Sequence, residues 1–252
     1  MKRIRLTIAY DGTNYCGWQI QPNGITIEEV LNEKISALTG EEIHVIGASR
    51  TDAGVHALRN VAVFDTQSQI PPQRMAYAIN QCLPEDIVIV DSCEVPEDWH
   101  PRYQNTITKT YEYHIYNAPV PDPLKRQYFA YVSYPLDVPK MRKGAAYLIG
   151  EHDFASFCNV KSNAQDTVRT VDEITITETG TKTLSGRDIT IRVVGKGFLY
   201  NMVRIIAGTL IRVGRGFYEP QRVQEILESK ERSEAGVTAP PQGLVLTNIE
   251  YQ

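Results

Sequence analysis

The chain of 252 residues is poor in cysteine, and none of its four cysteines stands in a C-x-x-C pair. This spacing indicates neither a zinc site nor a disulfide framework, so we expect buried, reduced thiols in a cytoplasmic protein. The sequence also lacks an apolar run approaching the roughly 18 residues of a membrane span, and no signal-peptide core follows the basic residues Lys2 and Arg3. Neither a glycine-rich nucleotide loop nor a cluster of His and Cys ligands is present. We therefore expect no cofactor, no metal ion and no membrane partner.

A surplus of positive charge is missing as well, because 30 Asp and Glu against 26 Lys and Arg give a formal net charge of −4. Phosphate contacts dominate the affinity for nucleic acids, so this balance argues mildly against such a partner. The distribution of the charged residues matters more than their sum. Acidic residues gather at 28–29, 41–42 and 225–234, whereas basic residues recur at 2–5 and 125–126. A basic surface on an acidic protein fits these numbers, and composition leaves the question of an RNA partner open.

Hydrophobic periodicity divides the chain into two similar halves of α+β character. In the first half it predicts strands and helices at 3–10, 26–40, 43–47, 60–66, 71–82 and 86–95, in the order β-α-β-β-α-β. A capping box of Thr26 and Glu29 marks the start of the helix at 26–40, and Gly40 marks its end. In the second half it predicts elements at 108–116, 139–149, 168–177, 187–194, 199–212 and 244–250, with a short helix after Pro220 and a hairpin turn at 180–186. We predict two related split βαβ (ferredoxin-like) domains, 1–105 and 106–252, with a mostly antiparallel central sheet and a cleft between the halves.

The most informative segment is Gly47–Ala57, which reads G-A-S-R-T-D-A-G-V-H-A. It follows the apolar run 43–46, and an extended chain would point Arg50 and Asp52 the same way. Gly54 allows a sharp turn behind them. Small neighbours leave the carboxylate reachable beside a cation. A bare R-x-D is more often a turn with an incidental ion pair, so the functional interpretation depends on the whole segment.

This segment resembles the signature of the tRNA pseudouridine synthase A family, and further matches follow in the family's order along nearly the whole chain. They are D-G-T-N-Y-C-G-W-Q at 11–19, W-H-P-R-Y at 99–103, K-T-Y-E-Y at 109–113, H-D-F-A-S-F at 152–157, F-L-Y-N-M-V-R at 198–204 and A-P-P-Q-G-L at 239–244. The resemblance implies the pseudouridine synthase fold. It also implies an isomerase that moves the attachment of uracil from N1 to C5 without a cofactor.

By the same resemblance, the catalytic residue is Asp52. Arg204 is expected to pair with it, because an adjacent guanidinium favours the ionised carboxylate. Tyr111 is expected to pack on the target base, and Leu244 to line the base pocket. Arg50 is expected to fill the space that the flipped uridine leaves in the RNA stack. The structural alternatives are a core position for the tyrosine and a structural ion pair for the helix arginine.

The stretch 99–103 resembles an RNA-contacting segment of the family, with Trp and Tyr in place of two phenylalanines and Pro in place of alanine. The residues expected to contact RNA are therefore Arg50, Trp99, His100, Pro101, Arg102 and Tyr103. Pro101 restrains His100 towards extended geometry, so the firmest expectation in this stretch is a phosphate contact from Arg102.

The implied substrate is uridine in the anticodon stem-loop of tRNA, at tRNA positions 38, 39 and 40, and the implied assembly is a homodimer. Three other interpretations stay open: a paralogue that modifies a different RNA uridine, a non-catalytic RNA-binding module, and a nucleoside hydrolase. The order β-α-β-β-α-β is also that of an RRM, although the RRM aromatic motif is absent. A hydrolase usually needs a second carboxylate near Asp52. The carboxylate either attacks the sugar or abstracts a sugar proton, and the sequence favours neither.

Overall fold

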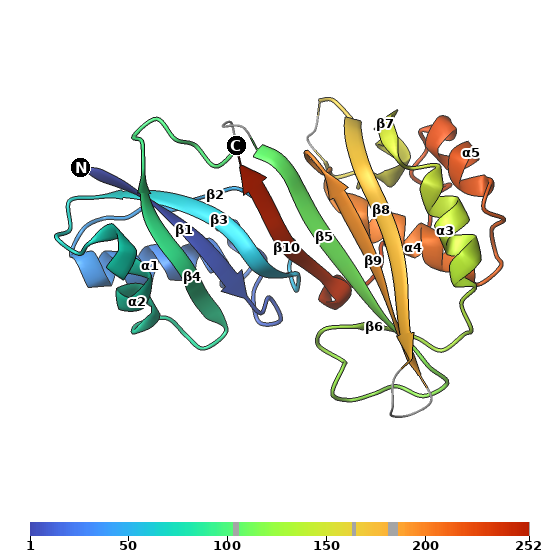
Figure 1. The fold of residues 1–252 in the computed structure, drawn as a ribbon, viewed down its shortest axis with the longest axis horizontal. Coiled ribbons are helices and arrows are strands. Elements are labelled where there is room, and N and C mark those ends of the chain that lie inside the picture. Colours follow the sequence, from blue (N-terminus) through green and yellow to red (C-terminus); the bar gives the residue numbers. More distant parts are fainter. Residues whose placement is uncertain (103–105, 163–164, 181–185, 252) are drawn as a thin grey trace. The chain divides into compact units, whose positions relative to one another are not determined.

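The structure, a computed structural model, describes residues 1–102, 106–162, 165–180 and 186–251, and the chain forms two compact units whose elements are labelled in Figure 1. Unit 1 comprises Met1–Ile107 and Val245–Gln252, and unit 2 comprises Thr108–Leu244. The sequence pattern assigned the closing strand to the second half. That strand instead belongs to unit 1, because it pairs in parallel with a strand of this unit, with Val245 opposite His56.

Unit 1 is a sheet with helices packed against it. Its elements are β1 (Lys2–Tyr10), α1 (Ile27–Thr39), β2 (Ile46–Gly47), β3 (His56–Thr66), α2 (Pro72–Asn80), β4 (Ile87–Val95) and, from the end of the chain, β10 (Leu244–Tyr251). The strands lie in the order β4-β1-β3-β10 with β2 beside β3, and only β3 and β10 are parallel. The first six elements follow the predicted split βαβ order.

Alternation along β1 separates the two faces of this sheet. Ile4, Leu6 and Ile8 are fully buried, whereas Arg3 and Arg5 belong to the opposite face and are half-buried. The helices complete the core with Ile27, Leu31, Ile35, Met75 and Ile79. Each such side chain contributes about 1.5–3 kcal/mol relative to an exposed position.

Helix α1 confirms the helix predicted from its capping signals. Thr26 accepts a hydrogen bond from the Glu29 backbone N–H, and the Glu29 carboxylate accepts one from the Thr26 N–H, which completes the capping box. Gly40 ends the helix in the left-handed region, at φ 73°.

The strand predicted at 43–47 is largely wrong, because only Ile46–Gly47 pairs with a neighbour. The Ile43 N–H donates to the Ser36 hydroxyl (3.0 Å), and the Val45 N–H donates to the Asn32 amide oxygen (2.8 Å). Polar side chains of α1 thus take the backbone donors that a strand ladder would use.

Unit 2 is also a sheet covered by helices. Its elements are β5 (Thr106–Asn117), β6 (Ala130–Val132), α3 (Val138–Ala146), β7 (Gly150–Asp153), β8 (Val168–Gly180), β9 (Arg187–Gly195), α4 (Met202–Gly214) and α5 (Arg222–Ser229), with 3-10 turns at Ala155–Phe157 and Pro241–Gly243. The strands lie in the antiparallel order β5-β9-β8-β7, with β6 parallel to β5. The predicted α+β class with mostly antiparallel pairing is confirmed, although β6 and β7 were not predicted. The hairpin turn predicted at 180–186 includes residues 181–185, which lie outside the described residues.

Helix α4 is the most deeply buried helix element of unit 2, with every residue from Ile205 to Leu210 buried. It begins at Met202, three residues later than predicted, because Asn201 adopts a left-handed conformation at φ 60°. In the part of the chain that the structure describes, no helix is long and apolar enough to cross a membrane.

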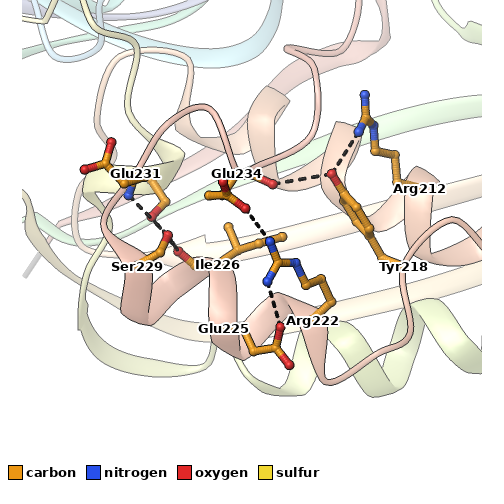
Figure 2. A network of polar contacts seen from close by, with 9 residues as sticks. Arg212, Tyr218, Arg222, Glu225, Ile226, Ser229, Glu231 and Glu234 are labelled. Atoms are coloured by element: carbon orange, nitrogen blue, oxygen red, sulfur yellow. Dashed lines mark hydrogen bonds and ion pairs between the residues drawn. The ribbon is translucent and has the colours of Figure 1, made fainter.

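A polar network fixes the chain that follows α5 (Figure 2). Arg222 pairs with Glu225 in its own helix and with Glu234 beyond it. Tyr218 accepts a hydrogen bond from Arg212 (2.8 Å) and donates to the Glu234 carbonyl (3.4 Å). Exposed ion pairs contribute only about 0–1 kcal/mol each, so the network chiefly sets the path of the segment that leads to residues of the candidate site.

Candidate active site

The predicted catalytic loop, Gly47–Ala57, runs from the end of β2 into the start of β3. No strand forms between these two elements. The argument that an extended chain would point Arg50 and Asp52 the same way therefore does not apply. Gly54 turns the chain at φ 74°, and the Val55 N–H closes the turn on the Asp52 carbonyl (3.1 Å). Arg50 is exposed and Asp52 is half-buried. The loop therefore holds a carboxylate on a defined turn where it is accessible from outside unit 1.

Buried polar side chains hold this loop in place. Asn60 donates from Nδ2 to the Ser49 carbonyl (3.1 Å) and to the Tyr10 hydroxyl oxygen (3.2 Å). The Tyr10 hydroxyl lies 2.7 Å from the Thr51 hydroxyl. Asn60 is completely buried and Tyr10 is 4% exposed. Because a buried polar group that loses its partner costs about 1–3 kcal/mol, the residues before Asp52 have one strongly favoured position.

We expect Tyr10→Phe to lower kcat about three- to tenfold with little change in KM, because a shift of the loop misplaces the carboxylate without removing a contact to RNA. Stability should fall by about 1–2 kcal/mol. Single-turnover rates and thermal melts measure both effects. The matched control is Tyr15→Phe. The Tyr15 hydroxyl donates to the Asp86 carboxylate (2.5 Å), which lies outside the loop. A Tyr10→Phe protein with a normal rate per folded molecule would show that this hydroxyl serves stability alone.

The glycine-rich motif at 11–19 packs against the same backbone. A Cβ atom on Gly17 would lie 2.6 Å from the Thr51 carbonyl oxygen, and one on Gly12 would lie 2.0 Å from the Val55 carbonyl oxygen. Real Cβ atoms do not approach so closely. The motif is therefore the close-packed support of the loop, in addition to being a turn after β1.

Trp18 and His56 extend this support. The backbone N–H of Trp18 donates to the Thr51 carbonyl (3.1 Å). The fully buried Trp18 ring lies against Gly47, where a Cβ would be 2.3 Å from it. His56 is buried at the other end of the loop, and its Nδ1 accepts a hydrogen bond from the Gly12 N–H (3.0 Å). Both ends of the loop are thus tied to the segment that follows β1.

Arg102, from the stretch predicted to contact RNA, reaches the catalytic loop. Its Nε donates to the Gly47 carbonyl (2.7 Å), and its backbone N–H donates to His100 Nδ1 (3.1 Å). Burial lowers the pKa of His100, and the nearby Arg102 charge lowers it further, so this ring is neutral at pH 7. Arg102 therefore braces the start of the loop, and its phosphate contact stays a prediction.

Trp99 and Pro101 connect the same stretch to the last strand of unit 1. The Trp99 ring packs on Tyr251 with the centroids 5.0 Å apart, and the Tyr251 hydroxyl donates to the Pro101 carbonyl (3.0 Å). Pro101 is buried, whereas Trp99 is half-buried. The remaining predicted residue of the stretch, Tyr103, lies outside the described residues.

In unit 2, the strand, helix and turn motifs meet at Ala239 and Pro240. Arg204 Nε donates to the Ala239 carbonyl (2.8 Å), and the Ala239 N–H donates to the Arg204 carbonyl (3.1 Å). The Tyr113 hydroxyl donates to the Pro240 carbonyl (2.8 Å). Burial raises the pKa of Tyr113 while the Arg204 charge opposes this, so the hydroxyl remains a donor at neutral pH.

The predicted base contacts also lie in unit 2. Tyr111 is two residues from Tyr113 on β5 and shares its face of the strand. Tyr111 is 8% exposed, and its ring meets the Phe198 ring edge-on, with the centroids 5.3 Å apart and the ring planes at 87°. Leu244 is buried and follows Gly243, where a Cβ would lie 2.9 Å from the Tyr113 ring. These contacts connect residues whose motifs are far apart in the sequence.

Within each unit the structure brings predicted site residues into contact with supporting residues that the sequence did not single out. Asp52 belongs to unit 1 and Arg204 to unit 2, and their pairing stays a prediction. Sequence reasoning missed Tyr10 and Asn60. The available signal was one amide, Asn60, at the start of an otherwise apolar run. Among the described residues, no group of three or more His, Cys, Asp and Glu side chains is arranged to hold a metal ion.

The fold and the motifs define a class of RNA-modifying enzyme. A family model described as tRNA pseudouridine synthase matches residues 6–104 and 145–252. These ranges include the catalytic loop and the helix that carries Arg204. The chain therefore belongs to the tRNA pseudouridine synthase family and is an isomerase that converts uridine to pseudouridine.

Full-length relatives narrow this class further. The chain is 47% identical over 251 residues to tRNA pseudouridine synthase A of Thermoanaerobacter sp. (strain X514), with 100% of both chains covered. It is 48% identical over 253 residues to the protein of that name from Ruminiclostridium cellulolyticum, again with 100% of both covered. A protein named tRNA pseudouridine synthase A 2 from Clostridium perfringens is 46% identical over 251 residues, with the same coverage. The similarity thus extends over the whole of each relative.

Proposed function

We propose that this isomerase acts on uridines of the tRNA anticodon stem-loop and that Asp52 is its catalytic carboxylate. The observation that carries the proposal is the loop itself. A half-buried carboxylate follows an exposed arginine on a backbone that Tyr10, Asn60 and Gly17 hold in place. A fixed position matters because a shift of about 1 Å away from productive geometry can reduce a rate about a hundredfold.

The reaction needs no atom or electron from outside the substrate. The bond from N1 of uracil to C1′ of ribose breaks, a bond from C5 to C1′ forms, C5 loses its proton and N1 gains one. Asp52 starts this exchange either by attacking the sugar or by abstracting a sugar proton, and both routes require the ionised carboxylate. Arg204 supplies the positive charge that favours this form. Its Nε contact to Ala239 supports the role, because that contact fixes the guanidinium.

Access to the uridine requires that it leave the RNA stack, at a cost of a few kcal/mol. Arg50 is exposed beside Asp52, so its side chain is available to fill the space that the uridine vacates. Tyr111 offers an aromatic ring for the flipped base, and its edge contact with Phe198 supports the orientation of that ring. Leu244 lines the apolar side of the base pocket, and Trp99, His100, Pro101 and Arg102 contact the RNA.

Tyr111 variants separate base stacking from core packing. Tyr111→Phe keeps the ring and should leave stability nearly unchanged, so any loss of rate reports proton transfer by the hydroxyl. Tyr111→Ala should remove stacking of about 1–3 kcal/mol and reduce the rate about 5- to 150-fold per folded molecule. Single-turnover rates, with thermal melts to correct for the folded fraction, measure both variants.

Tyr116→Ala is the matched control for the tyrosine truncation. It removes a 1% exposed tyrosine from the same strand, so it should cost several kcal/mol of stability and leave the rate per folded molecule normal. If Tyr111→Ala behaves in the same way as this control, Tyr111 is a core residue and the base pocket lacks its proposed platform.

The assembly and location follow from the tRNA substrate and the family resemblance. We infer a homodimer in the cytoplasm, where tRNA is modified. Light scattering across micromolar concentrations tests the assembly, and a mass that stays at 28.4 kDa would contradict the dimer. Fractionation of cells tests the location.

A paralogue with a different target uridine is the second candidate. The observation in its favour is the numbered name, A 2, of the Clostridium perfringens relative. Mapping pseudouridines in total tRNA from a deletion strain decides between the two. Loss confined to the anticodon stem-loop supports the first proposal, whereas loss at another site assigns the chain to the second.

A further inference from the structure

The sheet of unit 1 carries a cavity on the face opposite its buried isoleucines and leucine. Its volume is about 200 Å³, enough for several water molecules at roughly 30 Å³ each. Strands β1, β3 and β10 supply the walls, which consist of Arg5, Thr7, Arg59, Val61, Ile249 and Tyr251. All of these residues lie in one unit, so the cavity is complete within unit 1.

Two guanidinium groups line this cavity without an acceptor among the described residues. Arg5 is half-buried and Arg59 is exposed, and neither side chain forms a hydrogen bond or an ion pair with the described part of the chain. The carboxylate of Asp65, on the same face, is bound by Arg3 through two hydrogen bonds. Asp91 lies opposite Thr7 on β4 and pairs with neither arginine. Because arginine is rarely buried unpaired, a half-buried guanidinium in a cavity indicates an anionic ligand.

The remaining polar groups of the cavity carry no negative charge. Burial raises the pKa of Tyr251, which the Arg5 charge only partly opposes, so the phenol is neutral and donates to the Pro101 carbonyl. Thr7 adds an uncharged hydroxyl. The local charge of the lining is therefore positive, although the whole chain carries −4.

The cavity is connected to both parts of unit 1 that the family resemblance assigns to RNA. Tyr251 packs on Trp99 and bonds to Pro101, within the stretch predicted to contact RNA. Val61 accepts a hydrogen bond from the Ala48 N–H of the catalytic loop (2.8 Å). An anion in the cavity would thus lie beside surfaces that meet the substrate.

We propose that this cavity binds one backbone phosphate of the tRNA, with Arg5 and Arg59 donating to the same group. The proposal rests on tRNA as the substrate and extends the proposed function to a specific phosphate site. Arginine suits this role because its planar guanidinium presents several donors that match phosphate oxygens. Such a contact positions the RNA and carries no sequence information.

The test is the salt dependence of tRNA binding. Dissociation constants of the wild type, Arg5→Gln, Arg59→Gln and the double variant are measured on an unmodified tRNA transcript over a series of KCl concentrations. Each single variant should raise Kd roughly three- to tenfold. This change is larger than the loss of an exposed ion pair would cause and smaller than the loss of a buried hydrogen bond to a charged group would cause. A plot of the logarithm of the association constant against the logarithm of the salt concentration has a negative slope. In the double variant this slope should be less steep by about 0.7–0.9, the value for one phosphate. At saturating tRNA, kcat should be unchanged.

Arg74→Gln is the matched control, because it removes the same charge from α2, where the guanidinium lies over the Tyr77 ring at 5.9 Å. It should leave the slope unchanged. A double variant with the slope of the wild type, or with the same change as Arg74→Gln, would overturn the phosphate site. Arg59 is exposed, so Arg59→Gln should have the melting temperature of the wild type. This variant therefore tests the site even if Arg5→Gln is unstable.

The failure of this site is distinguishable from failure of the proposed function. A wild-type protein that releases no tritium from C5-labelled uridine in tRNA would overturn the function. A double variant that retains the wild-type Kd and slope, in a preparation whose wild type is active, overturns only the phosphate site. Phosphate contacts also act alike on different sequences, so the loss of affinity should be the same for two tRNAs with different anticodon stems.

Discussion

Asp52→Asn is expected to reduce turnover at least about a hundredfold while tRNA binding changes little. The amide has nearly the shape of the carboxylate, but it has no charge with which to attack the sugar and cannot accept a sugar proton. The hydrogen on C5 leaves when C5 joins the ribose, so tritium release from C5-labelled uridine measures the reaction directly. Filter binding of the same transcript measures affinity.

Asp172→Asn is the control for this substitution, since it makes the same change at an exposed position on β8. Its rate and its affinity should equal those of the wild type. An Asp52→Asn protein with more than about one hundredth of the normal release would exclude Asp52 as the catalytic carboxylate. A variant that has lost tRNA binding as well would instead assign Asp52 to the binding of RNA.

Gly17→Ala is expected to have the second largest effect, although position 17 carries no reactive group. Gly17 adopts φ 88°, and a Cβ there would lie 2.6 Å from the Thr51 carbonyl oxygen and 3.1 Å from the Asp52 carbonyl carbon. The loop must move to admit a methyl group, and the left-handed backbone adds strain. We expect a loss of stability of about 2–3 kcal/mol and a fall in kcat of about a hundredfold.

Gly40→Ala separates strain from displacement. Gly40 also has a positive φ, 73°, but a Cβ there meets nothing within 4 Å, and the residue only ends α1. It should cost about 1 kcal/mol of stability and leave kcat unchanged. Denaturant unfolding and single-turnover rates compare the two alanine variants. If Gly17→Ala is destabilised but retains a normal rate per folded molecule, the position of the loop is not what limits catalysis.

The supporting contacts fix the loop that carries the proposed catalytic carboxylate. Tyr10, Asn60 and Trp18 are buried, and each bonds to the loop backbone or to a side chain in it. Groups fixed before the substrate arrives need no reorganisation during the reaction. The Tyr10→Phe, Gly17→Ala and Asp52→Asn variants therefore test the supporting hydroxyl, the supporting backbone and the reacting group separately.

Local signals determined much of unit 1 and the identity of the candidate site. The capping box at Thr26 and Glu29 and the glycine at 40 predicted α1, because they satisfy the free N–H and C=O groups at its ends by short-range contacts. Alternation predicted β1 for a similar reason, since the period of the side chains depends only on the local backbone. The motif around Asp52 was recognisable because its order and spacing are written directly in the chain.

Contacts between distant residues decided the rest. Most of the strand predicted at 43–47 does not form, because side chains of Asn32 and Ser36 on α1 accept hydrogen bonds from the backbone N–H groups of this segment. The closing strand joined unit 1 through pairing with β3, and no local pattern specifies a partner for a strand. The same holds for the hydrogen bond between Tyr10 and Thr51 and for the cavity that Arg5 and Arg59 both line. A sequence specifies which residues are buried or polar by their local period, whereas hydrogen-bond partners and cavity walls depend on which strands become neighbours.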